Sequence, residues 1–363
     1  MLAATASALA APVQAAQPAS CQSWSGTPVL NPGNELNVLN SVTVLSACNA
    51  WTVGLLHQDG NDFPLVEHWN GTSWKTSPVT QPADTEIQLA SVDAVSPADI
   101  WAVGSIFGSG QQTFTMHWDG KSWTQIGSQN QGTTSQLTGV SAVSARDVWA
   151  VGTSTTGGVD HTLTEHWNGS AWSIVKTSSP GDLSGVVATS ASNAWAVGNA
   201  TTSTSVVTLI LHWNGRKWAK ENSPSPGTAA DLASVAATSA RDAWAVGFAS
   251  AGAGGAQTLI LRWNGSKWSK VKSPSPGGPN GSARLLGVAA TAPGSAWAVG
   301  SVSGGSQTLI LHWNGRSWQL APSPNPGVTN QLSGVAASSS SNAWAVGGFL
   351  RNGSFQALAT HCC

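Results

Sequence analysis

A tryptophan motif that recurs at near-even intervals constrains this chain more than any other feature. Trp-x-Val-Gly occurs seven times in 363 residues, with copies 46 to 53 residues apart. The motif tryptophans are Trp51, Trp101, Trp149, Trp195, Trp244, Trp297 and Trp344. Self-similarity at such a period indicates a repeat architecture, in which each unit is one supersecondary structure that packs on its neighbours. The fold must therefore be a stack or a ring of about seven similar units.

A second motif, typically His-Trp-Asn-Gly-x-x-Trp, lies between successive copies of the first. Its tryptophan pairs are Trp69/Trp74, Trp118/Trp123, Trp167/Trp172, Trp213/Trp218, Trp263/Trp268 and Trp313/Trp318. Asn-Gly between apolar segments is a strong hairpin signal. No stretch has a sustained helical period. We therefore predict that each unit forms four short antiparallel strands, which we denote a to d in chain order.

Residues that occupy one place in every unit are expected to be structural. The strand-b tryptophans should fill the space between units, whereas one member of each strand c and d pair could be exposed. Asp or Asn precedes the motif tryptophan by two residues in six units, where we expect it to cap its own turn. The histidines of the second motif should satisfy buried strand groups. These histidines are His68, His117, His166, His212, His312 and His361, with Arg262 in the odd unit.

The two ends of the chain each carry part of one unit. The last unit stops at Cys362 and Cys363, before its Gly-x-x-Trp segment, and Cys21-Gln22-Ser23-Trp24 aligns with the missing part. A unit shared between the ends leaves no open sheet edge if the repeats close into a ring. We therefore predict an all-β, seven-bladed β-propeller. Its last blade is completed by an N-terminal strand near residues 21–27, paired with residues 357–362.

A four-stranded unit of about 50 residues resembles a kelch repeat in plan, over residues 20–363. Kelch blades end strand b with a diglycine and place Tyr and Trp six residues apart. Here a single Gly ends strand b except at Gly347-Gly348, and two tryptophans stand five apart. The resemblance implies a kelch-like propeller of a secreted, tryptophan-rich bacterial type. WD40 repeats fit less well, because the one Trp-Asp pair, Trp118-Asp119, falls in a c–d turn.

Composition and charge limit the function. Charged residues make up 9 % of the chain and the net charge is −1, which excludes a basic nucleic-acid binder. No apolar run reaches the roughly 18 residues of a membrane helix. Residues 1–16 are small and apolar, which predicts a truncated signal peptide, a secreted protein and one propeller domain over 17–363. Residues 1–182 carry a net charge of −9 and residues 183–363 of +8, so one half-disc should be acidic and the other basic.

Four cysteines fit an oxidising compartment. The alignment of the shared unit places Cys21 beside Cys363, with Cys48 in the first a–b turn, on the same face. We expect the disulfides Cys21–Cys363 and Cys48–Cys362, although four cysteines allow three pairings and Cys362 and Cys363 could exchange.

Residues outside the repeat positions are the candidate ligand-binding residues. We expect long b–c and d–a connections on one face of the disc, where variable loops on a rigid scaffold bind ligands. The candidates are His57, Asp59, Asp62, Phe63, Phe107, Asp160, His161 and Arg351. Their aromatic and hydrogen-bonding side chains favour a non-catalytic, extracellular, lectin-like module that binds glycans. The alternative geometry is several sites between blades, built from the strand c and d tryptophans.

Two other functions stay open. A kelch-like scaffold would bind a surface or secreted protein. An enzyme acting on glycans ranks third, because the chain has no tyrosine for the copper-radical or sialidase chemistry known on propellers. Asp59-Gly60-Asn61-Asp62 lacks a full calcium-loop pattern, so we expect no metal and no cofactor.

Overall fold

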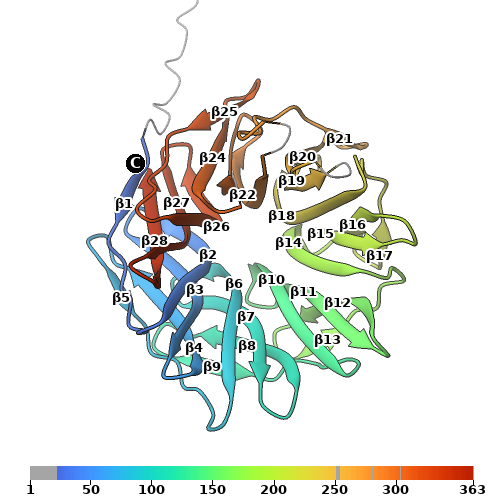
Figure 1. The fold of residues 1–363 in the computed structure, drawn as a ribbon. Helices are drawn as coiled ribbons and strands as arrows, with labels where there is room; N and C mark the ends of the chain where they lie inside the picture. Colours follow the sequence, from blue (N-terminus) through green and yellow to red (C-terminus); the bar gives the residue numbers. More distant parts are fainter. Residues whose placement is uncertain (1–22, 251–253, 279–280, 303, 363) are drawn as a thin grey trace, which may run out of the picture.

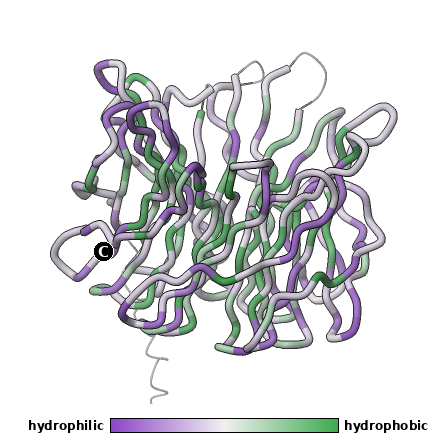
Figure 2. Tube along the Cα trace, turned by 90° about the horizontal axis from the view of Figure 1, so that it is seen from below, coloured by the Kyte–Doolittle hydropathy of each residue, from purple (hydrophilic) through white to green (hydrophobic). Residues whose placement is uncertain are grey.

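The computed structural model describes residues 23–250, 254–278, 281–302 and 304–362, which form a ring of seven antiparallel blades (Figure 1). The described residues form 28 strands and no helix, so the predicted seven-bladed all-β fold is confirmed. We number the blades 1 to 7 in the order of their innermost strands. Hydrophobic residues run along the strands, and hydrophilic ones gather at the turns (Figure 2). No helix long and apolar enough to cross a membrane occurs in these ranges.

Each blade contributes one strand to each of four concentric positions. The innermost strands are β2 (Leu36–Ser46), β6 (Glu86–Ser96), β10 (Thr134–Ser144), β14 (Asp182–Ser190), β18 (Ala229–Ser239), β22 (Ala283–Ala292) and β26 (Thr329–Ser339). The second strands are β3 (Asn49–Gln58), β7 (Asp99–Phe107), β11 (Asp147–Thr156), β15 (Asn193–Thr201), β19 (Asp242–Ser250), β23 (Ser295–Val302) and β27 (Asn342–Arg351). The third strands are β4 (Asn61–Trp69), β8 (Gln111–Trp118), β12 (Val159–Trp167), β16 (Val206–Trp213), β20 (Gln257–Trp263), β24 (Gln307–Trp313) and β28 (Ser354–Cys362). The outermost strands are β5 (Trp74–Thr76), β9 (Trp123–Ile126), β13 (Trp172–Ile174), β17 (Trp218–Lys220), β21 (Trp268–Lys270), β25 (Trp318–Ala321) and β1 (Ser25–Thr27).

The ring closes as predicted, through a blade shared between the two ends of the chain. β1 pairs antiparallel with β28, with Ser25 opposite His361 and Thr27 opposite Ala359. Figure 1 shows blue β1 beside red β28. Trp24 is buried and meets Trp297 of blade 6 edge-to-face, with ring centroids 5.2 Å apart. The N-terminal strand therefore completes blade 7 and seals it against blade 6.

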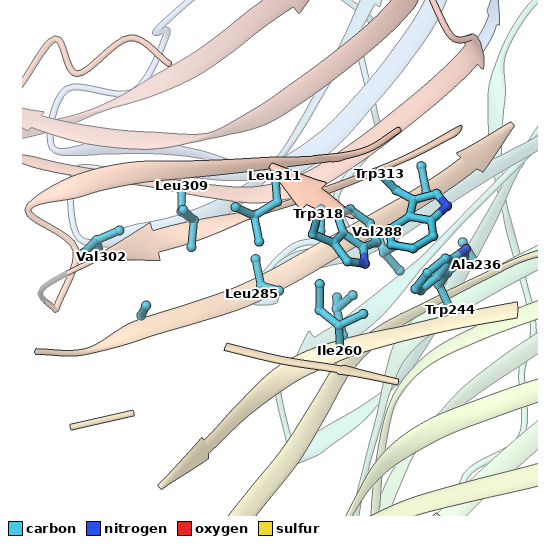
Figure 3. Close-up of a cluster of buried hydrophobic side chains, with 14 residues drawn as sticks. Ala236, Trp244, Ile260, Leu285, Val288, Val302, Leu309, Leu311, Trp313 and Trp318 are labelled. Atoms are coloured by element: carbon cyan, nitrogen blue, oxygen red, sulfur yellow. The ribbon is translucent and has the colours of Figure 1, made fainter. Parts of the chain in front are cut away.

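Tryptophans fill the space between blades. All seven strand-b tryptophans are buried, and each packs on the strand-d tryptophan of an adjacent blade. Figure 3 shows one such cluster, where Trp244 of blade 5 meets Trp313 and Trp318 of blade 6. Large aromatic side chains bury much apolar area and add edge-to-face attraction. The expectation of a structural role for these repeated residues is confirmed.

The motif position requires glycine because the backbone of the inner strand lies too close to it to leave room for a Cβ atom. Each inner strand has a β-bulge opposite this glycine, for example between Leu183 and Gly185 in blade 4. A Cβ placed on Gly198 would lie 2.0 Å from the carbonyl oxygen of Asp182. The other six motif glycines have the same contact at 1.9–2.0 Å.

We therefore expect Gly198→Ala to lower the free energy of unfolding by at least ~2 kcal/mol, because the bulge would have to shift. The matched control is Gly26→Ala in β1, where an added Cβ meets nothing within 4 Å. Urea denaturation of both variants measures the difference. Equal midpoints for the two variants would show that the bulge adapts without cost.

The Asp or Asn before each motif tryptophan does not cap its turn, contrary to expectation. In blade 2 the Asp99 Oδ1 accepts hydrogen bonds from Trp101 Nε1 at 3.2 Å and from His117 Nε2 at 2.8 Å. The turn is instead capped by the preceding serine, as when Ser96 Oγ accepts the Ala98 N–H. In all six units this side chain instead accepts from the strand-c histidine or arginine, which needs an acceptor. Among the described residues, only in blades 1 and 2 does it also accept from the indole of the motif tryptophan.

The two faces of the disc differ in their connections. We call the side with the a–b and c–d turns the hairpin face, and the side with the b–c turns and d–a connections the connector face. The d–a connections are long, as expected; residues 77–85 join β5 to β6. The b–c connections of blades 1, 2, 3 and 7 are not long loops, because strands b and c continue to tight turns at 59–60, 108–110, 157–158 and 352–353.

One predicted disulfide is wrong. Cys48 is an exposed free thiol, so the Cys48–Cys362 bond is not formed. Cys48 packs against the β4–β5 turn of its own blade, where a Cβ on Gly71 would lie 3.1 Å from its Sγ. Cys362 is fully buried in blade 7 and is disulfide-bonded. The predicted partners Cys21 and Cys363 lie outside the described residues.

Candidate functional site

A cavity with aromatic walls opens on the connector face between blades 1 and 2. It has a volume of about 600 Å³, which is within the range typical of small-ligand sites. Phe63 at the start of β4 and Phe107 at the end of β7 both line it, and Phe63 is 37 % exposed. Residues 81–86, from the d–a connection and the start of β6, form the rest of the wall together with Asn61 and Gly108. The two aromatic side chains thus provide an accessible apolar surface beside a polar connector.

Gln81 lines this cavity and has an unused hydrogen-bond acceptor. Its Nε2 donates to the backbone oxygens of Asp62 and Thr85, which fixes the amide. Its Oε1 is buried and has no hydrogen-bond partner within the described ranges. A buried polar atom without a partner costs free energy. A ligand donor that reached this oxygen would recover that cost.

A series of hydrogen-bonded polar side chains lies beside the cavity. His57 Nδ1 lies 2.6 Å from Asp62 Oδ1, and His57 Nε2 lies 3.2 Å from Glu35 Oε2. Asp62 Oδ2 accepts a 2.6 Å hydrogen bond from Gln88 Nε2 of β6. The hydrogen bond to Asp62 raises the pKa of His57 above its usual value, and the charge of Glu35 adds to the effect. Asp62 therefore joins His57 of blade 1 to Gln88 of blade 2 beside the cavity.

Acidic side chains dominate the connector face of blades 1 to 3. They occur in the connectors, in the b–c turns and at the strand ends beside them, at Glu35, Asp59, Asp62, Asp84, Glu86 and Asp160. Of the four basic residues of the same blades, Lys75 lies in β5 and Lys121 and Arg146 lie in hairpin-face turns, while Lys176 lies in the connector after β13. The predicted charge asymmetry between half-discs is thus also an asymmetry between faces. Such a surface attracts cationic partners.

The structure brings together some of the predicted ligand residues and separates others. Phe63 and Phe107 line one cavity, with His57 and Asp62 paired beside it. Asp59 occupies the adjacent turn with a φ of 51° and accepts a hydrogen bond from Asn34.

The other three lie outside this site. Asp160 is held by Thr155 Oγ1, and His161 lines a separate cavity of about 500 Å³ on blade 3. Arg351 is exposed at the β27–β28 turn of blade 7. All except Asp59 lie in strands, because the b–c connections are tight turns.

Gln81, Asp84 and Glu86 were not among the predicted residues. Gln81 and Asp84 belong to the connection between blades 1 and 2, and Glu86 begins β6. The available signal was the acidic pair Asp84 and Glu86 at this connection. The described residues contain no group of three or more His, Cys, Asp or Glu side chains placed to hold a metal ion.

The alternative ligand sites predicted between blades would be lined by the strand c and d tryptophans, which are less accessible. The strand-d tryptophans are buried except for Trp123, and the strand-c tryptophans are half-buried except for Trp313, which is buried. Each strand-c indole N–H donates to a carbonyl of its own a–b turn, as Trp118 does to Pro97. These tryptophans can offer only part of a ring face to a ligand.

Comparison with known proteins identifies the fold alone. No family model and no curated protein matches the chain. Among solved structures, YCF48 bound to D1 peptide is similar at a TM-score of 0.59 and 16 % identity, over 95 % of this chain and 98 % of that chain. YCF48 from Cyanidioschyzon merolae gives 0.58 and 16 %, over 93 % and 98 %. A protein of unknown function from Dyadobacter fermentans gives 0.51 and 13 %, over 78 % and 96 %. These likenesses support a β-propeller, while the kelch-like type stays a prediction.

Proposed function

We propose that this chain is a secreted, non-catalytic binding module that holds a basic peptide segment of a partner protein at the Phe63–Phe107 cavity. The observation that carries the proposal is an accessible aromatic cavity set in an acidic face. Phe63 and Phe107 would contact an apolar side chain of the peptide, and Asp84 and Glu86 would pair with its Lys or Arg residues. A structurally similar protein, YCF48, binds a peptide, which supports this ligand class for a propeller of this shape.

Because the rim of the cavity is acidic, a basic peptide is a better candidate ligand than the glycan expected from the sequence. Charge complementarity gives specificity and fast association when the ligand carries the opposite charge. A neutral sugar can donate hydroxyl hydrogen bonds to carboxylates but gains no charge attraction from them, whereas a basic peptide does. Binding should therefore weaken as salt is raised, because exposed charges are screened beyond about 10 Å at 0.1 M ionic strength.

The test is selection of heptapeptides from a random display library on the immobilised protein. We expect enrichment of sequences that join Lys or Arg to an aromatic or branched aliphatic residue. Phe63→Ala and Phe107→Ala should each weaken binding of a selected peptide at least tenfold in calorimetric titration, since buried aromatic anchors dominate interface energies. The matched control is Val159→Ala, which truncates an exposed apolar side chain at the blade 3 turn. Enrichment of acidic peptides, or equal effects of all three variants, would contradict the proposal.

A glycan remains the second candidate, favoured by the unpartnered Gln81 Oε1 beside two aromatic rings. Aromatic faces with a few fixed hydrogen-bonding groups also suit sugar rings. In this case a glycan array should give a neutral hit with one site per chain, and Gln81→Leu should weaken it at least tenfold. Hits that bind several molecules per chain would favour inter-blade sites instead.

A further inference from the structure

A second candidate site lies on the hairpin face at the same junction of blades 1 and 2. At six of the seven junctions the strand-b tryptophan of one blade stacks at a tilt on the strand-c tryptophan of an adjacent blade, with centroids 4.8–5.0 Å apart. Between blades 5 and 6 the protein covers this pair itself. The Arg262 guanidinium lies 4.7 Å from the Trp244 ring centroid and 5.6 Å from that of Trp313.

Between blades 1 and 2 the equivalent space is open. Position 262 corresponds to His68, whose shorter side chain stacks on Trp51 at 4.3 Å and reaches no further. A cavity of about 350 Å³ remains, lined by Trp118, His68, Lys75 and Asn49 among others. The half-buried Trp118 provides a ring surface at the mouth of this cavity.

Asn49 supplies a donor that no other blade leaves unused. Its Oδ1 accepts hydrogen bonds from Trp51 Nε1 and His68 Nε2 at 3.1 Å each. Its NH₂ group can therefore only donate. The matching amides of Asn193 and Asn342 donate to hydroxyl groups four residues earlier, but blade 1 has Leu45 at that place. Within the described residues the Asn49 amide NH₂ therefore has no acceptor.

Lys75 adds the only cation at its repeat position. It lies opposite His68 in the β4–β5 ladder, on the exposed edge of the cavity. The other blades have Thr124, Ser173, Ala219, Ser269, Gln319 and Ser25 in this place. The nearby Asp119 carboxylate accepts the backbone N–H groups of Lys121 and Ser122 in its own turn. Besides the hydroxyls of Thr76 and Ser77, the cavity thus offers one amide donor, one ammonium and one indole face.

From this geometry we infer that the cavity binds an acidic sugar, a uronic acid residue of a polysaccharide. The carboxylate accepts hydrogen bonds from the Asn49 amide and the Lys75 ammonium, and the C–H face of the sugar ring packs on Trp118. A charge-assisted pair to a carboxylate is stronger than a neutral hydrogen bond. This site is independent of the peptide cavity on the opposite face.

The test compares glucuronate with glucose by saturation-transfer NMR and calorimetry on the full chain. Glucuronate should bind at least tenfold more tightly than glucose. Asn49→Asp should weaken glucuronate binding at least tenfold, because it replaces the donor with a like charge. This variant should keep the fold, since Asp99 accepts the same two hydrogen bonds in blade 2.

Two controls make the result specific. Lys75→Met should weaken glucuronate binding, whereas Lys217→Met, in a hairpin-face turn of blade 4, should leave it unchanged. Phe63→Ala should also leave it unchanged, which separates this site from the peptide cavity. Equal affinity for glucose and glucuronate, no binding of either, or full binding by Asn49→Asp would overturn the inference. Binding of hippurate without glucuronate would also overturn it, by assigning the cavity to a peptide carboxylate.

Discussion

A chain that lacks residues 1–30 should unfold at lower urea concentration and less cooperatively than the full chain. The deletion removes β1 from the ring seam, together with the hydrogen bond from Thr360 Oγ1 to the Ser25 carbonyl. It also removes Trp24 from the cluster it shares with Trp297. Trp24→Ala alone should cost about 3–5 kcal/mol, the range for truncating a buried tryptophan.

Deletion of residues 1–16 is the control for this experiment, because it leaves β1 in place. That shorter deletion should unfold at the same urea concentration as the full chain. If the 1–30 deletion also matches the full chain, then the seam contributes no stability and the ring holds through six complete blades.

The protein should lose stability as the pH rises from about 4.5 to about 7. Glu67 and Glu165 are fully buried on strand c, at the position where blades 4 to 6 have leucine. Burial raises the pKa of each carboxyl to about 7, although one backbone N–H, from Leu30 or Gln129, partly offsets this. The second oxygen of each has no hydrogen-bond partner in the described part of the chain.

The sign follows from linkage. A carboxyl whose folded-state pKa is raised holds its proton more tightly when folded, so its contribution is fully present below pH 4.5 and is lost as the pH passes 7. One pKa unit corresponds to ~1.4 kcal/mol, so the loss is roughly 3 kcal/mol per carboxyl.

Glu67→Gln and Glu165→Gln should each remove their part of this decline and raise the free energy of unfolding at pH 8 by about 1–2 kcal/mol, after the cost of a buried amide. Urea denaturation at pH 5 and pH 8 measures both effects. Glu221→Gln, at the edge of blade 4, is the control and should change neither. A pH slope that the buried-residue variants leave intact would refute the assignment.

The fold was predictable because its signal is repeated. Seven copies of Trp-x-Val-Gly make the strand assignment secure even where one copy alone would be ambiguous. Asn-Gly, or Asp-Gly at Asp119-Gly120, marks each complete outer hairpin. The shared blade was predictable for the same reason, since Cys21–Trp24 aligns with a segment that the last unit lacks. A closed ring is the arrangement in which that division leaves no open sheet edge.

The site was only partly predictable, because contacts between blades join residues that are far apart in the sequence. His57, Asp62, Phe63 and Phe107 were found as departures from the repeat, but the length of the strands that carry them was not. The Asn49 donor depends on the absence of a hydroxyl at Leu45, which matters only once both side chains face the same space.

The amino-acid sequence by itself determined the blade number, the strand order, the ring closure and the tryptophan layers, because all of these follow from periodicity. Only the tertiary structure decided that Phe63 and Phe107 face one cavity, that acidic side chains gather on the connector face of blades 1 to 3, and that Cys48 stays a free thiol. These depend on where each turn packs. A turn is positioned by the neighbouring chain against it, such as the β4–β5 turn beside Cys48, and no repeat pattern records that contact.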